Sequence, residues 1–466
     1  MLSFFKINDP YRLIAIFLIA FAIKMPFFIN DCGYFDMQHW LIIGEAMKTG
    51  HMYVDIFDSL APLAATTYWW ITLIFGKSTI GLHILGTLLM VIQAIIFNNL
   101  TISNKVYEQN TYLPAFVYII LASSNYTLSV FSPAQLGMTF ILLAFGKLLS
   151  HVEFRAKRDE QIMSIGLLVG VAVLFYLPFI VFLPIVLIIL LLFTNTLKRR
   201  YVILTISALI PLVSAFAYYW MVNNESGYFM VNFVYPSLAI NISTFASIGL
   251  NIVLFLPVLV FWLLGFITMP KQRRLNNYQS RLAQLFFITG LLTLLILLLE
   301  SADIYAGMVM LVPVAAFFTT HMFFLIRRPL IDLIATLGFI SFVLMISYDS
   351  EFRYLGLNTT IKKEVTVEPE LASLIEGKKL MVLGEKKELY TYGSLSTPFY
   401  NWALSTPILE NLEYYDNVVF IKESVDKYQP EIILDYELIW GKVLVHIPEF
   451  NEQYDEVRPF VWVRKK

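Results

Sequence analysis

The chain is poor in cysteine and poor in charge. Cys32 is its only cysteine, which excludes an internal disulfide and a cysteine-rich metal site. Charged residues make up 14 % of the 466 residues, whereas an ordinary soluble domain has about 25 %. Apolar residues make up 58 %, which is more than a soluble fold of this size can bury. This composition excludes a disordered chain, argues against a soluble enzyme and indicates a membrane protein.

The sequence also lacks the signatures of several other protein classes. Its net charge of −1 gives no basic field that would attract nucleic acid, so no nucleic-acid partner is expected. It contains no P-loop, no G-x-S-x-G and no H-E-x-x-H motif. Gly384 follows a predicted strand, but the glycine set of a dinucleotide site is missing around it.

Long apolar runs fill residues 1–350. Each is about long enough to cross a hydrocarbon core of ~30 Å, and together they predict about eleven transmembrane helices. We place these at 11–30, 81–99, 112–129, 133–150, 163–177, 178–197, 200–222, 249–268, 281–299, 305–326 and 330–348. The first run lacks a small-x-small cleavage site, so we expect it to be retained. The apolar segment 61–76 is short and starts with Ala-Pro, and we interpret it as a re-entrant or interfacial helix.

The basic residues between the runs predict the orientation of the chain. With the N-terminus in the cytoplasm, the inner connections carry nearly all of the Lys and Arg, as cytoplasmic loops do. The outer connections near 130–132, 223–248 and 300–304 hold none, and the first outer loop holds only Lys48 and Lys77. If segment 61–76 crossed the membrane, the later basic clusters would face outward. We therefore predict a cytoplasmic N-terminus and a tail on the outer side.

The apolar runs stop at Glu351, and the tail 351–466 has the composition of a soluble domain. It holds 14 Lys and Arg against 19 Asp and Glu, a net charge of −5. Short apolar runs at 380–383, 431–435 and 460–464 predict strands. Val418, Ile421, Val425 and Tyr428 form the apolar face of a helix predicted over 417–428. The predicted fold class is a mostly α polytopic membrane domain, 1–350, followed by a small C-terminal α/β domain outside the cytoplasm.

The first outer loop, 31–80, holds most of the outer charge of the membrane domain and is the candidate site. Phe35, Trp40, Ile43 and Met47 predict an amphipathic helix over 36–48 that lies in the membrane interface. Asp36 heads this helix, where the helix dipole favours an anion. Three roles are open for its carboxylate: a general base, a ligand of a divalent cation such as Mg²⁺ or Mn²⁺, or an ordinary N-cap. No residue is assigned as a metal ligand, and no cofactor other than that cation is expected.

Other polar residues on the outer side are also candidates. Lys24 lies within the first predicted span, where a lysine either snorkels to the interface or marks a functional site. His83 opens the second span, either as an interfacial histidine or as a contact for phosphate. Tyr305 belongs to a short outer turn with Glu300 and Asp303.

The spacing of residues in the first loop matches one enzyme family. Asp36 is followed by Gly50, by Y-V-D-I-F-D-S-L-A-P-L and by F-G-K-S, which comprise Tyr53–Asp55, Phe57–Asp58, Pro62–Leu63 and Phe75–Ser78. This stretch resembles the GT-C class of membrane glycosyltransferases, the polyprenyl-phosphate-sugar-dependent enzymes related to protein mannosyltransferases and aminoarabinose transferases. Residues 11–99 carry most of the resemblance, and the later spans agree with it in number and order.

The resemblance implies an activity, a location and partners. The protein would transfer a sugar, with inversion, from a polyprenyl-phosphate carrier to a glycan, lipid or protein acceptor on the outer, periplasmic face of the bacterial inner membrane. Membrane lipids and the lipid-linked donor are the expected partners. Asp36 would be the general base, and a basic loop residue would neutralise the leaving phosphate. The candidates for substrate binding are Lys24, His39, Asp55, Asp58, Lys77, His83 and Tyr305.

Two departures from the family's pattern support an alternative function. Asp36 is followed by Met37, where the family usually has a second acidic residue, and the outer loop Glu300–Ile304 lacks the arginine often found there. The alternative is a catalytically inactive GT-C-like membrane subunit that acts as a scaffold for a membrane-protein partner. The two hypotheses differ in whether Asp36→Asn abolishes sugar transfer.

Overall fold

The computed structural model divides the chain into two compact units. The first comprises Met1–Cys32, Ile80–Ala215 and Ala239–Ile361, and the second comprises Gly33–Thr79, Phe216–Leu238 and Lys362–Lys466. The second unit therefore joins three segments that are far apart in the sequence. The residues that the structure describes are 2–29, 35–124, 130–154, 158–194, 197–223, 226–238, 255–271, 276–297, 308–352 and 368–465.

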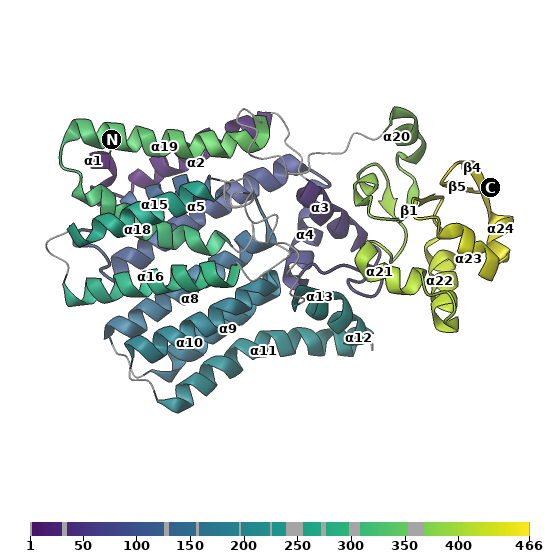
Figure 1. Ribbon diagram of the computed structural model, residues 1–466, viewed down its shortest axis with the longest axis horizontal. Coiled ribbons are helices and arrows are strands. Elements are labelled where there is room, and N and C mark those ends of the chain that lie inside the picture. Colours follow the sequence, from purple (N-terminus) through teal and green to yellow (C-terminus); the bar gives the residue numbers. More distant parts are fainter. Residues whose placement is uncertain are drawn as a thin grey trace. The chain divides into compact units, whose positions relative to one another are not determined.

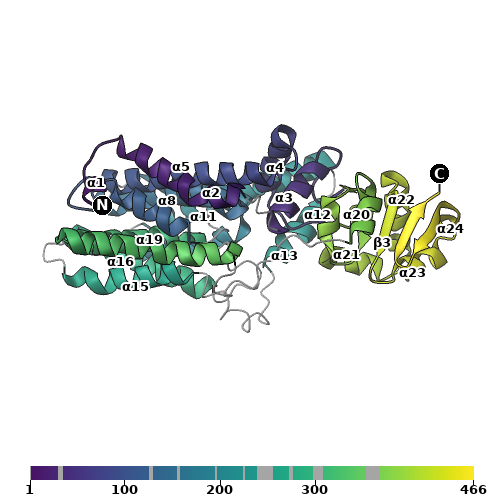
Figure 2. The same ribbon diagram turned by 90° about the horizontal axis from the view of Figure 1, so that it is seen from above.

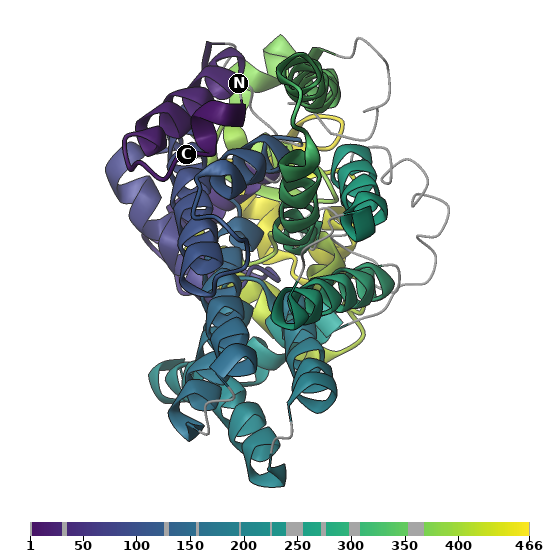
Figure 3. The same ribbon diagram turned by 90° about the vertical axis from the view of Figure 1, so that its left-hand side faces the viewer.

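The first unit is built from helices that mostly run side by side (Figure 1), and Figure 3 views many of them nearly end-on. In chain order they are α1 (Leu2–Phe5), α2 (Arg12–Ile29), α5 (Thr79–Ser103), α6 (Leu113–Ala122), α8 (Pro133–Phe154), α9 (Asp159–Phe175), η1 (Leu177–Val181), α10 (Phe182–Phe193), α11 (Lys198–Asn223), α15 (Leu256–Thr268), η4 (Met269–Lys271), α16 (Asn277–Leu297), η5 (Met308–Met310), α18 (Leu311–Leu325) and α19 (Pro329–Phe352). The last residues of α11 belong to the second unit.

Five of these helices, α2, α5, α8, α11 and α19, are long and apolar enough to cross a membrane, judged by length and composition. Shorter apolar helices are α6, η1 with α10, α15 and α18. Each of the eleven predicted spans falls on a helix, which agrees with a helical membrane protein. The number of crossings stays a prediction, because parts of the predicted spans 11–30, 112–129, 178–197, 249–268, 281–299 and 305–326 lie outside the described residues.

Two glycines let α9 pack closely against α11. A Cβ atom on Gly166 would lie 1.9 Å from Ser207 Oγ, and one on Gly170 would lie 2.3 Å from the Ala208 carbonyl oxygen. The glycines are four residues apart and therefore lie on the same face of α9. In lipid, where the hydrophobic effect does not drive helices together, such small-residue pairs allow the close contact on which packing depends.

The second unit consists of a small sheet and short helices. Its elements are α3 (Phe35–Ala46), α4 (Pro62–Phe75), α12 (Ser226–Phe229), the π-helical η2 (Met230–Val234), α13 (Tyr235–Leu238), α20 (Pro369–Ile375), β1 (Lys379–Leu383), η6 (Lys387–Thr391), β2 (Ser394–Leu395), α21 (Trp402–Leu409), α22 (Tyr415–Tyr428), β3 (Ile432–Asp435), α23 (Trp440–His446), α24 (Glu449–Gln453), β4 (Tyr454–Arg458) and β5 (Val461–Arg464).

The sheet has the strand order β2-β1-β3-β5-β4 and is packed by α22, α23 and α24 (Figure 2). β1 pairs in parallel with β2 and β3, whereas β5 pairs antiparallel with β3 and β4. The central strands are almost entirely apolar and buried, as strands covered on both faces are. The three predicted strands and the predicted helix of the tail are thereby confirmed. The predicted start of the tail at residue 351 lies beside residues 353–367, outside the described residues, and stays a prediction.

The core of the second unit includes a residue of the first loop. Phe57 is 1 % exposed and packs among Met381, Phe399, Ile421 and other buried residues of the tail. Its ring stacks on Phe420, with 5.8 Å between ring centroids. The loop backbone also pairs with the tail, because the Phe57 N–H donates to the Pro398 carbonyl and the Phe57 carbonyl accepts from the Asn401 N–H. The first loop is thus an integral part of the tail's core.

Candidate functional site

The helix predicted in the first loop exists as α3, but its environment differs from the prediction. Asp36 lies in its first turn and is exposed. Met37, Leu41 and Ile42 are buried although the predicted apolar stripe did not include them. The prediction of a single apolar stripe was therefore wrong, while the position of the helix in the membrane interface stays a prediction. The reason is that α3 packs against α4 on one side and against η6 and β2 of the tail on another.

The contact between α3 and α4 depends on a glycine and an aromatic pair. A Cβ atom on Gly44 would lie 2.5 Å from the Tyr68 carbonyl oxygen, so only glycine allows this approach. Trp40 stacks on Tyr68 with 5.4 Å between ring centroids. Burial raises the pKa of the Tyr68 hydroxyl well above its usual value, and the negative charge of Asp36 adds to this effect. The exposed carboxylate of Asp36 is therefore set close to the junction of the two helices.

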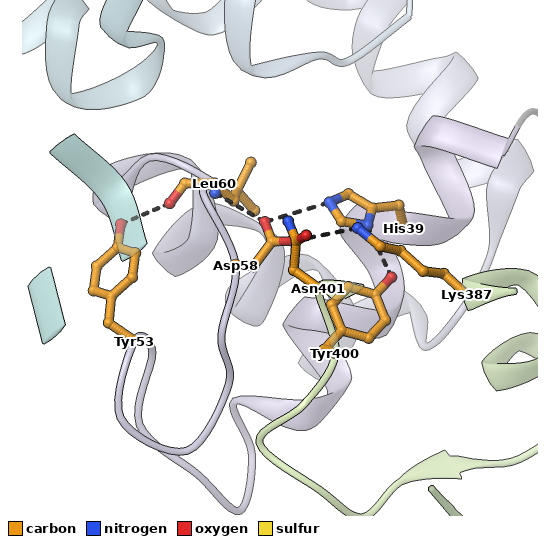
Figure 4. Close-up of polar contacts among 7 residues, drawn as sticks. All are labelled: His39, Tyr53, Asp58, Leu60, Lys387, Tyr400 and Asn401. Carbon is orange, nitrogen blue, oxygen red and sulfur yellow. Dashed lines mark hydrogen bonds and ion pairs between the residues drawn. The ribbon is translucent and has the colours of Figure 1, made fainter. Parts of the chain in front are cut away.

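Asp58 is the centre of a buried polar network (Figure 4). The Leu60 N–H donates to Oδ1 at 2.9 Å, and His39 Nε2 lies 3.4 Å from the same oxygen. The Asn401 side chain donates to Oδ2 at 3.4 Å, and Lys387 Nζ lies 3.9 Å from it. Asp58 is only 1 % exposed, so four groups, two of them from the tail, satisfy a carboxylate that water does not reach.

Electrostatics within this network favour the ionised form of Asp58. Burial alone would raise its pKa. The charge and hydrogen bond of His39, the charge of Lys387 and the hydrogen bond from Leu60 outweigh burial and lower the pKa to about 2. Asp58 is therefore an anion under all ordinary conditions, and it holds the cations that face it.

His39 links Asp58 to Tyr400. Its Nδ1 and the Tyr400 hydroxyl oxygen are 2.8 Å apart, and the two rings stack with 5.2 Å between centroids. With Nε2 directed at Asp58, the neutral ring fits the tautomer that donates from Nε2 and accepts from the Tyr400 hydroxyl at Nδ1. Both ring nitrogens are thus oriented by fixed partners, and burial places the pKa of Tyr400 well above its usual value.

Asp55 binds a second pair of residues from the tail. Lys427 Nζ donates to its Oδ1 at 2.7 Å, and the Tyr428 hydroxyl donates to the same oxygen. The His51 N–H donates to Oδ2 at 2.7 Å. Burial raises the pKa of Asp55, but these hydrogen bonds outweigh it and lower the pKa below its usual value. In turn, burial and the bond to Asp55 raise the pKa of Tyr428 to about 12.

Tyr53 fixes the turn that precedes the two aspartates. It has a φ of 72°, which L-residues with side chains rarely adopt, and it is completely buried. Its hydroxyl donates to the Leu60 carbonyl at 2.6 Å, while its own carbonyl accepts from the Asn232 side chain at 2.8 Å. The segment 226–238 thus supports the strained turn that leads to Asp55 and Asp58.

Gly50 makes room for Asp55, which gives a testable prediction. A Cβ atom on Gly50 would lie 2.9 Å from Asp55 Cβ, so Gly50→Ala must displace that side chain from Lys427. We expect the second unit to lose about 1–3 kcal/mol of stability, the usual cost of such overpacking. The measurement is the melting temperature of the purified full-length protein. Gly441→Ala is the matched control, because a Cβ atom there meets nothing within 4 Å; an equal shift for both variants would contradict the prediction.

Lys77 also contacts the tail. Its Nζ lies 3.3 Å from the Gly393 carbonyl oxygen and 3.5 Å from that of Tyr390. Burial lowers the pKa of Lys77, although the nearby charge of Glu45 opposes this. Four of the predicted substrate-binding residues, His39, Asp55, Asp58 and Lys77, are therefore bonded to the tail within the second unit.

Lys24 and His83 lie in the first unit, each only 2 % exposed. The Lys24 ammonium sits 4.5 Å from the centroid of the Phe27 ring, and the His83 ring contacts the same phenylalanine with 6.2 Å between centroids. This burial contradicts both surface interpretations, the lysine that snorkels to the interface and the interfacial histidine. Both side chains are held among helices instead, and their part in substrate binding stays a prediction. Tyr305 lies outside the described residues.

The sequence contained no signal for the tail residues that complete the network. Lys387, Tyr400, Asn401 and Lys427 are ordinary polar residues of a soluble domain, and Asn401 is separated from Asp58 by 343 positions. Among the residues that the structure describes, no three His, Cys, Asp or Glu side chains are grouped as metal ligands would be. The divalent cation left open by the sequence stays a prediction.

Comparison with known proteins adds a likeness of fold. No family model and no curated protein matches the chain. The solved structures that it resembles include the crystal structure of the oligosaccharyltransferase of Archaeoglobus fulgidus, tethered through a disulfide bond to an acceptor peptide that contains the NVT sequon. The match covers 91 % of this chain and 69 % of that chain, with 11 % sequence identity and a TM-score of 0.49. This likeness concerns the fold and nothing beyond it.

Proposed function

We propose that the protein is an inverting GT-C-like glycosyltransferase of the bacterial inner membrane. In this proposal it transfers a sugar from a polyprenyl-phosphate carrier to an acceptor on the periplasmic face. The observation that supports it best is a difference among the three aspartates of the first loop. Asp55 and Asp58 are buried and bonded to the tail, whereas Asp36 is exposed. A general base must be reached by the acceptor, so Asp36 is the carboxylate that suits this role.

The proposed reaction is a single displacement. The acceptor hydroxyl attacks the anomeric carbon while its proton passes to a carboxylate oxygen of Asp36. The bond between that carbon and the phosphate oxygen breaks on the opposite side, so the configuration inverts. The polyprenyl phosphate leaves with the electron pair, and its added negative charge requires a nearby cation.

Asp36→Asn tests this assignment directly. The amide cannot accept the proton, so we expect the rate of sugar transfer to fall by about a hundredfold or more. Because Asp36 is exposed, we expect insertion and folding to be unchanged. The measurement is transfer from a panel of undecaprenyl-phosphate sugars by the purified full-length protein, with the melting temperature recorded for both proteins.

The matched control is Glu45→Gln, which removes another carboxylate from the same helix. Glu45 pairs with Lys48 at 3.5 Å and is not part of the proposed reaction, so its variant should transfer sugar like the wild type. Full activity of Asp36→Asn would overturn the assignment of the base. If the wild type transfers no sugar from any donor and co-purifies with a membrane partner, the inactive-subunit alternative is favoured.

A further inference from the structure

The end of α11 and the helical run that follows it expose a group of large apolar side chains. This group, which we call the 216–235 surface, is 36–81 % exposed and consists of Phe216, Tyr218, Trp220, Met221, Val231 and Tyr235. Val231 and Tyr235 are four residues apart and therefore lie on the same face of the run α12–η2–α13. The only charged residue in the sequence 216–238 is Glu225. Exposed apolar side chains gathered in this way mark a surface that contacts something other than water.

The opposite face of the same run is fixed within the second unit. Phe229 stacks on Tyr219 of α11 with 5.1 Å between ring centroids, so the run folds back onto α11 (Figure 1). Phe233 and Asn232 are buried, and the Asn232 side chain donates to the Tyr53 carbonyl at 2.8 Å. The 216–235 surface is thus the outward side of a packed element, and it cannot turn inward without breaking these contacts.

Continuity with α11 indicates what covers this surface. α11 is one of the five helices long and apolar enough to cross a membrane, and its candidate span, Lys198–Met221, ends within the surface. Only 22 % of the apolar window of that span is buried, and exposed side chains such as Ile206 and Val213 precede the surface along the helix. A helix that crosses lipid brings side chains at its end, such as Trp220, to the boundary between hydrocarbon and water.

The kinds of side chain in the surface favour lipid over a polypeptide partner. Tyr218, Trp220 and Tyr235 are amphipathic, and Trp and Tyr are enriched where acyl chains meet water, because one end of each ring is apolar and the other is polar. Surfaces that bind another polypeptide usually have a polar rim and often have Arg among their anchors. The sequence 216–238 contains no Arg and no Lys.

We propose that the 216–235 surface lies in the headgroup region of the membrane and binds phospholipid directly. The run α12–η2–α13 is then an interfacial anchor, and Asn232 joins this anchor to the first loop at Tyr53. The sequence places 226–238 in a connection between predicted spans, so this contact goes beyond the predicted crossings. The inference does not rest on sugar transfer, because it concerns the enzyme and the inactive subunit alike.

The test is the quenching of a fluorescent label at a single cysteine of the full-length protein in phosphatidylcholine nanodiscs. Cys32→Ser removes the only thiol of the chain, so Val231→Cys and Met221→Cys can each be labelled alone with an NBD group. One quencher is a phosphatidylcholine that carries a nitroxide near the top of its acyl chain, and the other is iodide in water. We expect the lipid nitroxide to quench both labels about twofold or more above its effect on a water-exposed control label, and iodide to quench them less.

Val445→Cys in the same background is the matched control. Val445 is likewise an exposed valine of the second unit, at 76 % against 53 % for Val231, but it lies on α23 next to His446 and close to Lys442. Its label should be quenched by iodide and little by the lipid nitroxide. Val231, Met221 and Val445 are all exposed, so we expect the three substitutions to leave folding unchanged, and the melting temperature of each labelled protein checks this.

Each outcome decides the proposal. Equal quenching by iodide of the Val231→Cys and Val445→Cys labels would overturn it, because the run would then lie in water. A Val231→Cys label that neither quencher reaches would also overturn it, since a partner polypeptide or a second copy would cover the surface. Equal lipid quenching of all three labels would do the same, because the contact would not belong to this surface in particular. Lipid quenching of the Met221→Cys and Val231→Cys labels, with iodide quenching of the Val445→Cys label, supports the anchor.

Discussion

Asp58→Ala is expected to destabilise the second unit by about 3–5 kcal/mol, the usual cost of removing one partner of a buried charge network. The substitution leaves the Leu60 N–H and the Asn401 amide without their acceptor and leaves Lys387 facing a cavity. It also releases His39 from the group that orients it. The bond from the Leu60 N–H is buried, so the loss of its acceptor leaves that donor without a partner at the full cost of its desolvation.

The measurement is the amide hydrogen exchange of β1 and β3 in the full-length protein, which reports the local opening of the tail. Glu413→Ala removes an exposed carboxylate from the same domain and should leave exchange within about 0.5 kcal/mol of the wild type. Equal protection in Asp58→Ala and the wild type would show that the network adds nothing to the stability of the unit.

The same carboxylate makes the stability of the unit dependent on pH. The pKa of Asp58 is about 2 in the folded protein, below its ordinary value of 3.8, so its contribution is fully present above pH 3.8. As the pH falls through that window, protonation removes about 2 kcal/mol of stability. Asp58→Asn lacks this titration, so the difference in melting temperature between it and the wild type should shrink between pH 5 and pH 2. A constant difference would contradict the lowered pKa.

Phe57→Ala is expected to cost the tail about 3–5 kcal/mol, although the substituted residue lies in another part of the sequence. The phenyl ring fills the tail's core, where it stacks on Phe420 and packs against Phe399. Its removal leaves a cavity in the core of a small domain.

Protection of β1 and β3 from hydrogen exchange again provides the measurement. Tyr415→Ala removes an aromatic ring that is 78 % exposed on α22, and it should have little effect. If Phe57→Ala leaves the exchange of both strands unchanged, the first loop is not part of the tail's core.

The sequence predicted the elements of the molecule better than it predicted their partners. Strands such as Leu380–Leu383 and the helix ending at Tyr428 follow from local periodicity, which depends on a few neighbouring residues. The apolar helix at 61–76 was also expected and is α4 (Pro62–Phe75), whereas its failure to cross the membrane stays a prediction. These features depend on the local hydrophobicity and the length of each segment, and both can be read from a single sequence.

The environment of the first loop could not be predicted in the same way. Asp55 and Asp58 have the spacing of a substrate-binding motif, and nothing in their neighbourhood indicates that Lys427 and Asn401 would bind them. The apolar stripe assigned to α3 was wrong for the same reason, because Leu41 and Ile42 are buried although they lie outside it. Contacts between segments this far apart depend on tertiary packing, which the local pattern does not contain.

The assembly of the second unit from distant segments has a consequence for the synthesis of the protein. The 343 positions between Asp58 and Asn401 take roughly 17–70 s to translate at about 5–20 residues per second. During this interval Phe57 and Asp58 have left the ribosome while their partners have not yet been made. A chain that ends early would therefore keep the membrane helices and the proposed base but lack Lys387 and an ordered first loop. We therefore expect the proposed activity only after translation of the tail is complete.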